Sequence, residues 1–202
     1  MDLDFCIAAR RDTRHFLSDP VPEEVLAHAL QAAHKAPSVG LSEPWRFVIV
    51  QSVQARKDLL ASFHMMKTLA EKDILDLEKK ALHASLKLEA IEDAPVGIGV
   101  FCERPPKGTY TIGTQGSAET VVWSCACAVQ NLWLSLTAQG FSAGWVSILD
   151  FELFRITLGV PATWEPLGYL CVGKPATDYG GKPMLETLGW KGRSEKPQVV
   201  YL

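Results

Sequence analysis

Hydrophobic residues recur every three or four positions in several stretches of the chain, a spacing that predicts amphipathic helices. The longest such stretch, 119–139, has few charged residues and ends before Gly140, a residue type that commonly follows a helix C-terminus. A helix that is apolar on most of its surface is expected at the centre of the fold. Further helices are predicted between Pro22 and Pro37, as a pair across 53–93, and at 151–158.

Short runs of β-branched and aromatic residues predict strands. Gly97 and Gly99 lie within one of these runs and indicate that another element approaches it closely. Strands and helices do not alternate strictly, which indicates an α+β fold rather than a doubly wound sheet. The five strands are predicted at 45–50, 96–102, 145–149, 167–172 and 198–202.

Two stretches rich in Gly, Pro and Lys separate the predicted elements: 103–118, a predicted loop, and 173–197, a predicted extended arm. About 25 residues without a clear element is long for a connection inside one domain. The spacing leaves two alternatives open, a surface loop or an arm that reaches a second subunit. We expect a single domain over 1–202, with 53–93 as a candidate lid and 174–202 as the C-terminal arm.

The composition is that of a folded protein with one core, since 48% of the 202 residues are hydrophobic. Lys and Arg number 20 and Asp and Glu number 23, so the formal net charge is −3. Such a balance gives no general attraction to nucleic acid or to an anionic membrane, and neither is expected as a partner. No signal peptide and no apolar stretch of about 20 residues is evident, so a cytoplasmic location is expected.

Neither the cysteines nor the histidines indicate a special site. The five cysteines are odd in number and mostly lie in apolar runs, which fits a reducing cytosol better than a disulfide framework. The five histidines do not show the spacing of a metal site, so no metal is expected.

Three cations lie within five residues of one another, at Arg10, Arg11 and Arg14. Planar guanidinium groups match the oxygens of a phosphate better than the point charge of lysine does. Two further cations, Lys191 and Arg193, lie beside a glycine in the predicted arm. From the residues alone, a solvated surface run is the simpler interpretation of the first cluster, and convergence of both clusters on one phosphate is a hypothesis.

An ordered set of motifs from about residue 5 to the C-terminus resembles the nitroreductase superfamily and, within it, the 5,6-dimethylbenzimidazole synthases of the BluB type. The motifs keep nearly constant spacing, which is more specific than any one of them. They are RRDTRHF at 10–16, APSVG at 36–40, PWRF at 44–47, ET at 119–120, QNLWL at 130–134 and GWVSI at 144–148. The chain departs from the family pattern at 117–123 and at Glu43, where a Gln is usual.

The resemblance implies a nitroreductase-like α+β fold in which helices flank a central mixed sheet. It also implies a homodimer that exchanges C-terminal arms and binds FMN at the subunit interface. The FMN phosphate and ribityl chain would be bound by Arg10, Arg11, Arg14, Lys191 and Arg193. Other flavin contacts would come from Asp12, Thr13, Ser38, Lys87 and Ser147.

The reaction that the resemblance implies is the O2-dependent fragmentation of reduced FMN to 5,6-dimethylbenzimidazole and erythrose 4-phosphate, in the biosynthesis of the lower ligand of cobalamin. NAD(P)H would supply electrons directly or through a separate flavin reductase. Asp12 would be the base and Ser147 a hydrogen-bonding group at the oxygen-bearing edge of the flavin. Without the resemblance, simpler roles are an internal ion pair for Asp12 and a main-chain hydrogen bond for Ser147.

Two other functions are consistent with a flavin site. One is an NAD(P)H-dependent nitroreductase or quinone reductase that retains its FMN, and the other is a non-catalytic flavin-binding dimer. The pair Asp12 and Ser147 favours fragmentation, because simple hydride transfer needs neither residue. A lid over 53–93 would suit an enzyme that shields its substrate from water.

Overall fold

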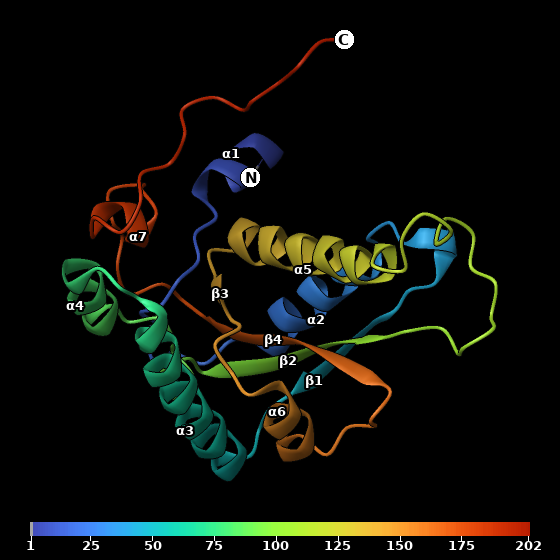
Figure 1. The fold of residues 1–202 in the computed structure, drawn as a ribbon, viewed down its shortest axis with the longest axis horizontal. Helices are drawn as coiled ribbons and strands as arrows, with labels where there is room; N and C mark the ends of the chain where they lie inside the picture. Colours follow the sequence, from blue (N-terminus) through green and yellow to red (C-terminus); the bar gives the residue numbers. More distant parts are fainter. Residues whose placement is uncertain (1) are drawn as a thin grey trace.

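A computed structural model describes residues 2–202, in which a four-stranded sheet lies between two layers of helices (Figure 1). The strand order is β1-β2-β4-β3, and every neighbouring pair is antiparallel. The expectation of a mixed sheet is therefore wrong for these four strands. The strands are β1 (Trp45–Ile49), β2 (Val96–Glu103), β3 (Ser142–Val146) and β4 (Trp164–Gly173).

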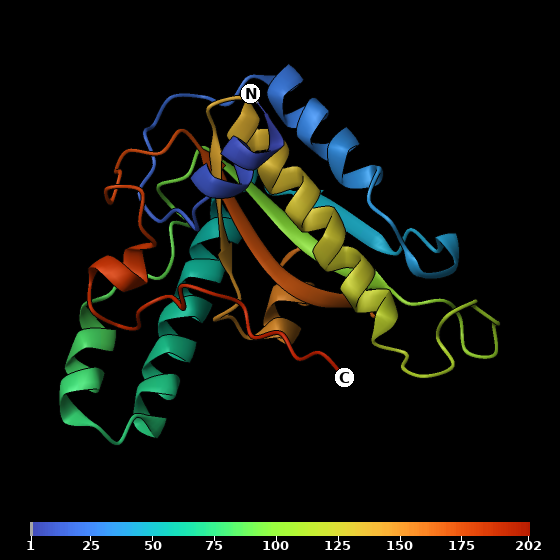
Figure 2. The ribbon, with the colours of Figure 1, turned by 90° about the horizontal axis from the view of Figure 1, so that it is seen from above.

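Helices cover both faces of the sheet. Figure 2 shows α5 (Thr120–Ala138) and α2 (Glu23–His34) side by side on one face. On the other face lie α3 (Val53–Ala70) and α6 (Phe151–Thr157), as Figure 1 shows. The remaining helical segments are α1 (Leu3–Ala9), η1 (Val39–Leu41), η2 (Glu71–Asp73), α4 (Leu77–Ser85) and α7 (Met184–Thr187).

Alternation along the strands creates two hydrophobic cores that share the sheet. In β4, Leu170 packs with α2 and α5, whereas Tyr169 and Cys171 pack with α3 and α6. Successive side chains of a strand point to opposite faces, so a strand covered on both faces needs apolar residues at almost every position. The central strands β2 and β4 meet this requirement.

The central helix α5 confirms the strongest of the predicted helices. Gly140 follows it in the left-handed region, at φ +78°, as expected after a helix C-terminus. Among the described residues α5 is also the one helix long and apolar enough to cross a membrane. Its eight buried residues pack against α2 and the sheet, as expected for a core helix.

Gly97 and Gly99 confirm the predicted close approach. A Cβ atom built on Gly97 would overlap the Tyr169 hydroxyl, and one on Gly99 would lie 2.7 Å from Leu158 Cδ1. The paired strand β4 and the loop after α6 thus occupy the space that side chains on these residues would need.

Three further sequence predictions differ from the structure, and one helix was not predicted. The strand predicted at 145–149 both begins and ends earlier, at Ser142–Val146, and its first residues, Ser142 and Ala143, are small residues that give little strand signal. Residues 198–202 form no strand, since they are exposed and have no neighbouring strand in this chain. The arm contains the short helix α7, and helix α1, capped by the Asp2 side chain, was not predicted.

We predict that Gly97→Ala destabilises the fold, because the added methyl group overlaps the buried Tyr169 side chain. Overpacking of a closed core should lower the free energy of unfolding by about 2 kcal/mol or more. Urea denaturation measures this change. Gly116→Ala is the control, since a Cβ there meets nothing within 4 Å, and an equal effect of both substitutions would contradict the prediction.

Candidate functional site

The arginine-rich segment 10–14 runs beside the edge strand β3. The Thr13 N–H donates to Ala143 O (3.0 Å), and the hydroxyls of Thr13 and Ser142 are hydrogen-bonded at 2.6 Å. A Cβ on Gly144 would overlap Thr13 O and the Arg14 guanidinium. A residue without a side chain is therefore required at 144 for the two segments to meet.

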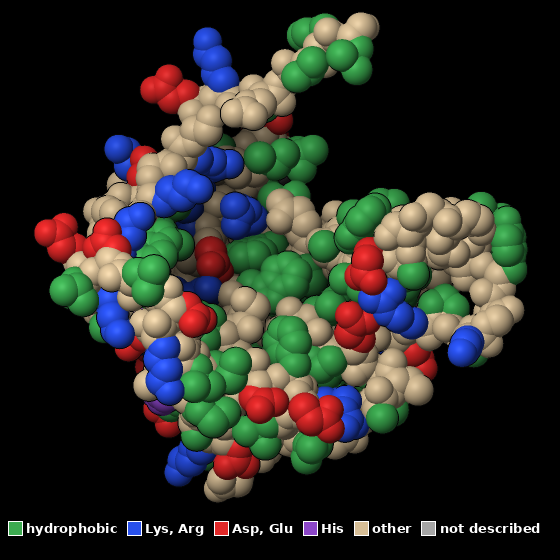
Figure 3. Space-filling view, in the orientation of Figure 1, with side chains coloured by type: hydrophobic (Ala, Val, Ile, Leu, Met, Phe, Trp, Pro, Cys, Tyr) green, Lys and Arg blue, Asp and Glu red, His purple; other side chains and the backbone are tan. Residues whose placement is uncertain are grey.

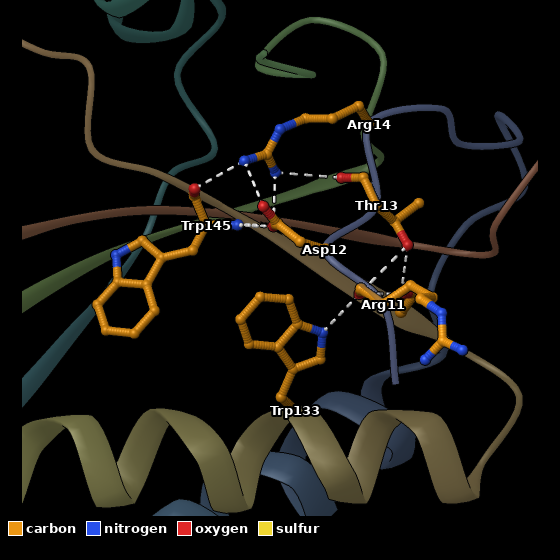
Figure 4. A network of polar contacts seen from close by, with 7 residues as sticks. Arg11, Asp12, Thr13, Arg14, Trp133 and Trp145 are labelled. Atoms are coloured by element: carbon orange, nitrogen blue, oxygen red, sulfur yellow. Dashed lines mark hydrogen bonds and ion pairs between the residues drawn. The ribbon is translucent and has the colours of Figure 1, made fainter. Parts of the chain in front are cut away.

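Asp12 and Arg14 form a bidentate ion pair within this contact (Figure 4). Both guanidinium nitrogens of Arg14 donate to the Asp12 carboxylate at 2.8 Å, and Nη2 also donates to Trp145 O at 2.8 Å. The Trp145 N–H donates to Asp12 Oδ1 at 2.8 Å. The Arg14 side chain is only 7% exposed, whereas that of Asp12 is 50% exposed. Arg14 and the Trp145 N–H thus fix the orientation of the Asp12 carboxylate, and the rest of the carboxylate is accessible to solvent.

Arg10 lies against the indole of Trp133, with its guanidinium carbon 4.9 Å from the ring centroid. Burial lowers the pKa of Arg10, and the positive charges of Arg11 and Arg193 lower it further, against the opposing effect of Asp12. Arg193 from the C-terminal arm therefore lies close enough to Arg10 to affect it. Two neighbouring cations favour the binding of an anion.

None of Arg10, Lys191 and Arg193 forms an ion pair with a carboxylate within residues 2–202. Figure 3 shows Lys and Arg side chains gathered at the C-terminal arm, beside a hollow with hydrophobic side chains on its floor. The basic side chains and the hollow thus meet on one face of the molecule.

Arg11 occupies a different position from the other arginines of the segment. Its guanidinium points away from the Asp12–Arg14 pair (Figure 4) and donates to Ala8 O (2.6 Å), Arg10 O (2.8 Å) and Gly181 O. The structure thus joins Asp12 to Arg14, places the charges of Arg11 and Arg193 near Arg10, and points the Arg11 guanidinium away from the Asp12–Arg14 pair.

Ser147 follows the end of β3, two residues after Trp145, so the two Cα atoms are about 7 Å apart in an extended chain. The residue is exposed, and its hydroxyl makes no hydrogen bond with the other described residues. A main-chain hydrogen bond, the simpler role considered for this hydroxyl, is therefore not formed. The hydroxyl is free to contact a ligand near Asp12.

Lys87 forms an ion pair with Asp93 at the end of the 53–93 region. Between them in the sequence, Ala90 is buried in the same core cluster as Cys171, whose thiol lies near the charges of Arg14 and Asp12. Burial raises the pKa of this thiol to about 12. The 87–93 segment therefore passes close to the ion pair of the site.

Ser38 is not brought to this site. The neighbouring Val39 N–H donates to Ser124 Oγ (3.0 Å) near the start of α5, whereas the Trp133 indole N–H donates to Arg11 O (3.2 Å) further along the same helix. Nine residues of helix separate Ser124 from Trp133, a rise of about 14 Å. Within one chain, Ser38 and Asp12 could contact the same ligand only if that ligand were long enough to span this separation.

The candidate lid divides into two parts with different attachments. Arg56 on α3 donates to Ala94 O (2.7 Å) and Pro95 O (3.0 Å), and Leu59 and Phe63 are buried in the core. The single buried residue of α4 is His83. Core packing therefore fixes α3 to the sheet, whereas α4 lacks this anchorage.

Two supporting residues carried no functional assignment in the sequence. Trp133, within the QNLWL motif, is buried, and it also contacts the Arg10 guanidinium and donates to the Arg11 carbonyl. Gly144 belongs to the GWVSI motif, and a glycine at this position is compatible with close approach of another segment. The sequence did not indicate that this segment is 13–14.

Three comparisons with known proteins complete the description of this site. Residues 7–174 match the nitroreductase family. A 5,6-dimethylbenzimidazole synthase of Rhodospirillum rubrum is 39% identical over 197 residues, which covers 98% of this chain and 92% of that protein.

Solved structures show the same fold at lower identity. An iodotyrosine deiodinase bound to FMN and 3-iodo-L-tyrosine is 21% identical, with a TM-score of 0.74 over 100% of this chain and 98% of that one. A BluB-like flavoprotein from Clostridium difficile 630 is 20% identical, with a TM-score of 0.70 over 98% of this chain and 95% of that one.

We predict that Arg14→Ala lowers the free energy of unfolding by about 2–3 kcal/mol, because the Trp145 carbonyl loses its side-chain donor and the Asp12 carboxylate keeps only the Trp145 N–H. The value is below that of a fully buried pair, since Asp12 is half exposed. Urea denaturation measures it. Glu152→Gln, which removes the charge of the 67% exposed partner of Arg155, should cause no measurable change, and equal effects would contradict the prediction.

Proposed function

The chain belongs to the nitroreductase family, and we propose that it is a 5,6-dimethylbenzimidazole synthase, which fragments reduced FMN with O2 to 5,6-dimethylbenzimidazole and erythrose 4-phosphate. The family match over 7–174 confirms the expectation drawn from the sequence motifs, and the nitroreductase-like fold is confirmed as well. The chain is an enzyme of the FMN-dependent oxidoreductase type. Its 39% identity to a synthase of this name, over nearly the full length of both proteins, supports the specific reaction.

The observation that carries the proposal is a group of unpaired cations next to a half-exposed carboxylate and a free hydroxyl. Arg10 and Arg193, with Lys191 nearby in sequence, suit the phosphate of FMN. The donor set therefore fits FMN: the cations would hold its phosphate, and Ser147 would contact the ring. FMN, when bound, supplies the redox chemistry and the carbon atoms of the product.

Asp12 would act as the base. Three donors hold its carboxylate, which leaves an acceptor position on the solvent side. A proton released on the ribityl side of the substrate could be accepted there. The ion pair with Arg14 was the structural alternative for Asp12, and it is compatible with catalysis because it fixes the orientation of the base.

Ser147 would donate a hydrogen bond at the oxygen-bearing edge of the bound substrate. Its hydroxyl is exposed and unengaged, about 7 Å along the strand from the residue that binds Asp12. Asp12 and Ser147 would thus act on different parts of one substrate molecule. Lys87 and Thr13 would support them from neighbouring segments.

We further propose that two copies of the chain form the working enzyme in the cytoplasm. Helix α1 exposes Leu3, Phe5 and Ile7, and the C-terminus exposes the apolar residues 199–202, an unusual amount of apolar surface for a monomer. Ser38, remote from Asp12 in its own chain, would reach the substrate of the second copy. Residues after Arg193 would form the exchanged part of the arm. Reduced FMN would come from NAD(P)H directly or through a flavin reductase.

We predict that Asp12→Asn and Ser147→Ala each lower the yield of 5,6-dimethylbenzimidazole at least about 100-fold, while FMN binding is retained. The assay incubates the protein with chemically reduced FMN in air and separates the products chromatographically. Asp58→Asn, an exposed carboxylate on α3 bonded to Gln54, is the control and should behave as the unmodified chain.

The same assay decides between the functions. Return of intact oxidised FMN from the unmodified chain would refute the synthase proposal. Turnover of a nitroaromatic with NAD(P)H in that case would establish the reductase alternative. Full product yield from both variants would remove the roles given to Asp12 and Ser147.

We predict that the protein sediments as a dimer at micromolar concentration, and that removal of residues 199–202 raises the dimer dissociation constant at least about tenfold. Analytical ultracentrifugation measures both. Leu75→Ser is the control, because Leu75 is also highly exposed (91%) but lies between α3 and α4. A monomeric unmodified chain would contradict the proposal of a dimer.

A further inference from the structure

Arg11 has the surroundings of a structural clamp rather than of an anion ligand. Its side chain leaves the 10–14 segment on the face opposite the Asp12–Arg14 pair (Figure 4). All its hydrogen bonds go to backbone carbonyls, and it forms no ion pair with a carboxylate among the described residues. The donors that Arg11 uses are its Nη1 and Nη2 groups, and its Nε atom is buried without a hydrogen-bond partner.

The carbonyl groups that Arg11 binds belong to separate parts of the chain. Ala8 lies in helix α1, and Gly181 lies in the segment that begins the C-terminal arm. One planar guanidinium group thus joins the N-terminal helix to a segment 170 residues away. The geometry of arginine, with several donors in a fixed plane, suits such a junction.

A tight turn presents the Gly181 carbonyl to Arg11. Gly180 and Gly181 have φ values of +63° and +74°, in the region that favours glycine. The Asp178 side chain accepts a hydrogen bond from the Gly181 N–H at 3.0 Å and so closes the turn. Gly181 is therefore held by two hydrogen bonds: its N–H donates to Asp178, and its carbonyl accepts from Arg11.

The arm beyond this turn leads to the two basic residues of the site. Met184 is buried, the Trp190 ring lies 5.9 Å from that of His83 on α4, and Lys191 and Arg193 follow. The charge of Arg193 reaches Arg10. The course of the chain after Gly181 therefore decides whether these cations lie beside Arg10.

We infer that Arg11 is a positioning residue: it holds the start of the C-terminal arm so that Lys191 and Arg193 face Arg10, and it does not contact the phosphate itself. The inference rests on the proposed function only for the identity of the anion as the phosphate of FMN. It divides the arginine cluster into one residue that binds the ligand, Arg10, one that orients Asp12, Arg14, and one that positions the arm, Arg11.

The first test is a double-mutant cycle on FMN affinity, followed by quenching of flavin fluorescence in the full-length protein. Arg11→Ala alone should weaken FMN binding about tenfold, since the arm cations are lost from the site. In the Lys191→Ala/Arg193→Ala background, Arg11→Ala should cost less than about twofold, whereas Arg10→Ala should still cost about tenfold. A tenfold loss from Arg11→Ala in that background would show a direct phosphate contact and overturn the inference.

The second test needs no flavin and therefore separates this inference from the proposed function. Amide hydrogen exchange in residues 176–190 of the flavin-free protein should accelerate at least about tenfold in Arg11→Ala and in Asp178→Ala. Arg11→Lys, which retains donors, should restore part of the protection. Arg155→Ala is the control. Unchanged exchange in both Arg11→Ala and Asp178→Ala would refute the clamp even if FMN binds as proposed.

Discussion

The contact between residues 11–14 and strand β3 is the interaction on which the site depends. It brings a charged segment near the N-terminus to a strand about 130 residues away, and the absent side chain of Gly144 makes the approach possible. Arg14 then serves two partners at once, the Asp12 carboxylate and the Trp145 carbonyl. The close approach at Gly144 thus fixes both the orientation of the Asp12 carboxylate and the path of the end of β3 before Ser147.

The same contact also covers part of the exposed edge of the sheet. Strand β3 lies at one edge, where unpaired N–H and C=O groups would otherwise be open to association with other chains. The isolated parallel bridge between Asp12 and Ala143 covers part of that edge. The hydroxyl pair of Thr13 and Ser142 adds a buried hydrogen bond beside it. The backbone of segment 11–14, whose Asp12 side chain belongs to the site, therefore also covers part of the edge of β3.

The sequence predicted elements that depend on local hydrophobic patterns, and it missed features that depend on contacts between residues far apart in the chain. The periodicity of 119–139 was sufficient for α5, because a helix apolar on most sides can only be central. The start of β3 was missed, since Ser142 and Ala143 are small residues with little strand signal and are in a strand because they pair with β4. The role of Arg11 could not be inferred, because alternation along 10–14 separates its side chain from Asp12 and only the fold reveals Gly181 on that side.

The ring contact between His83 and Trp190 has a mechanical consequence. His83 on α4 lies between Glu71, at 3.3 Å, and the indole of the arm. Displacement of α4 would separate the two rings unless Trp190 moved as well, so the ring contact links α4 to the stretch that carries Lys191 and Arg193. A movement of α4 would therefore be transmitted to the basic stretch of the arm through one aromatic contact.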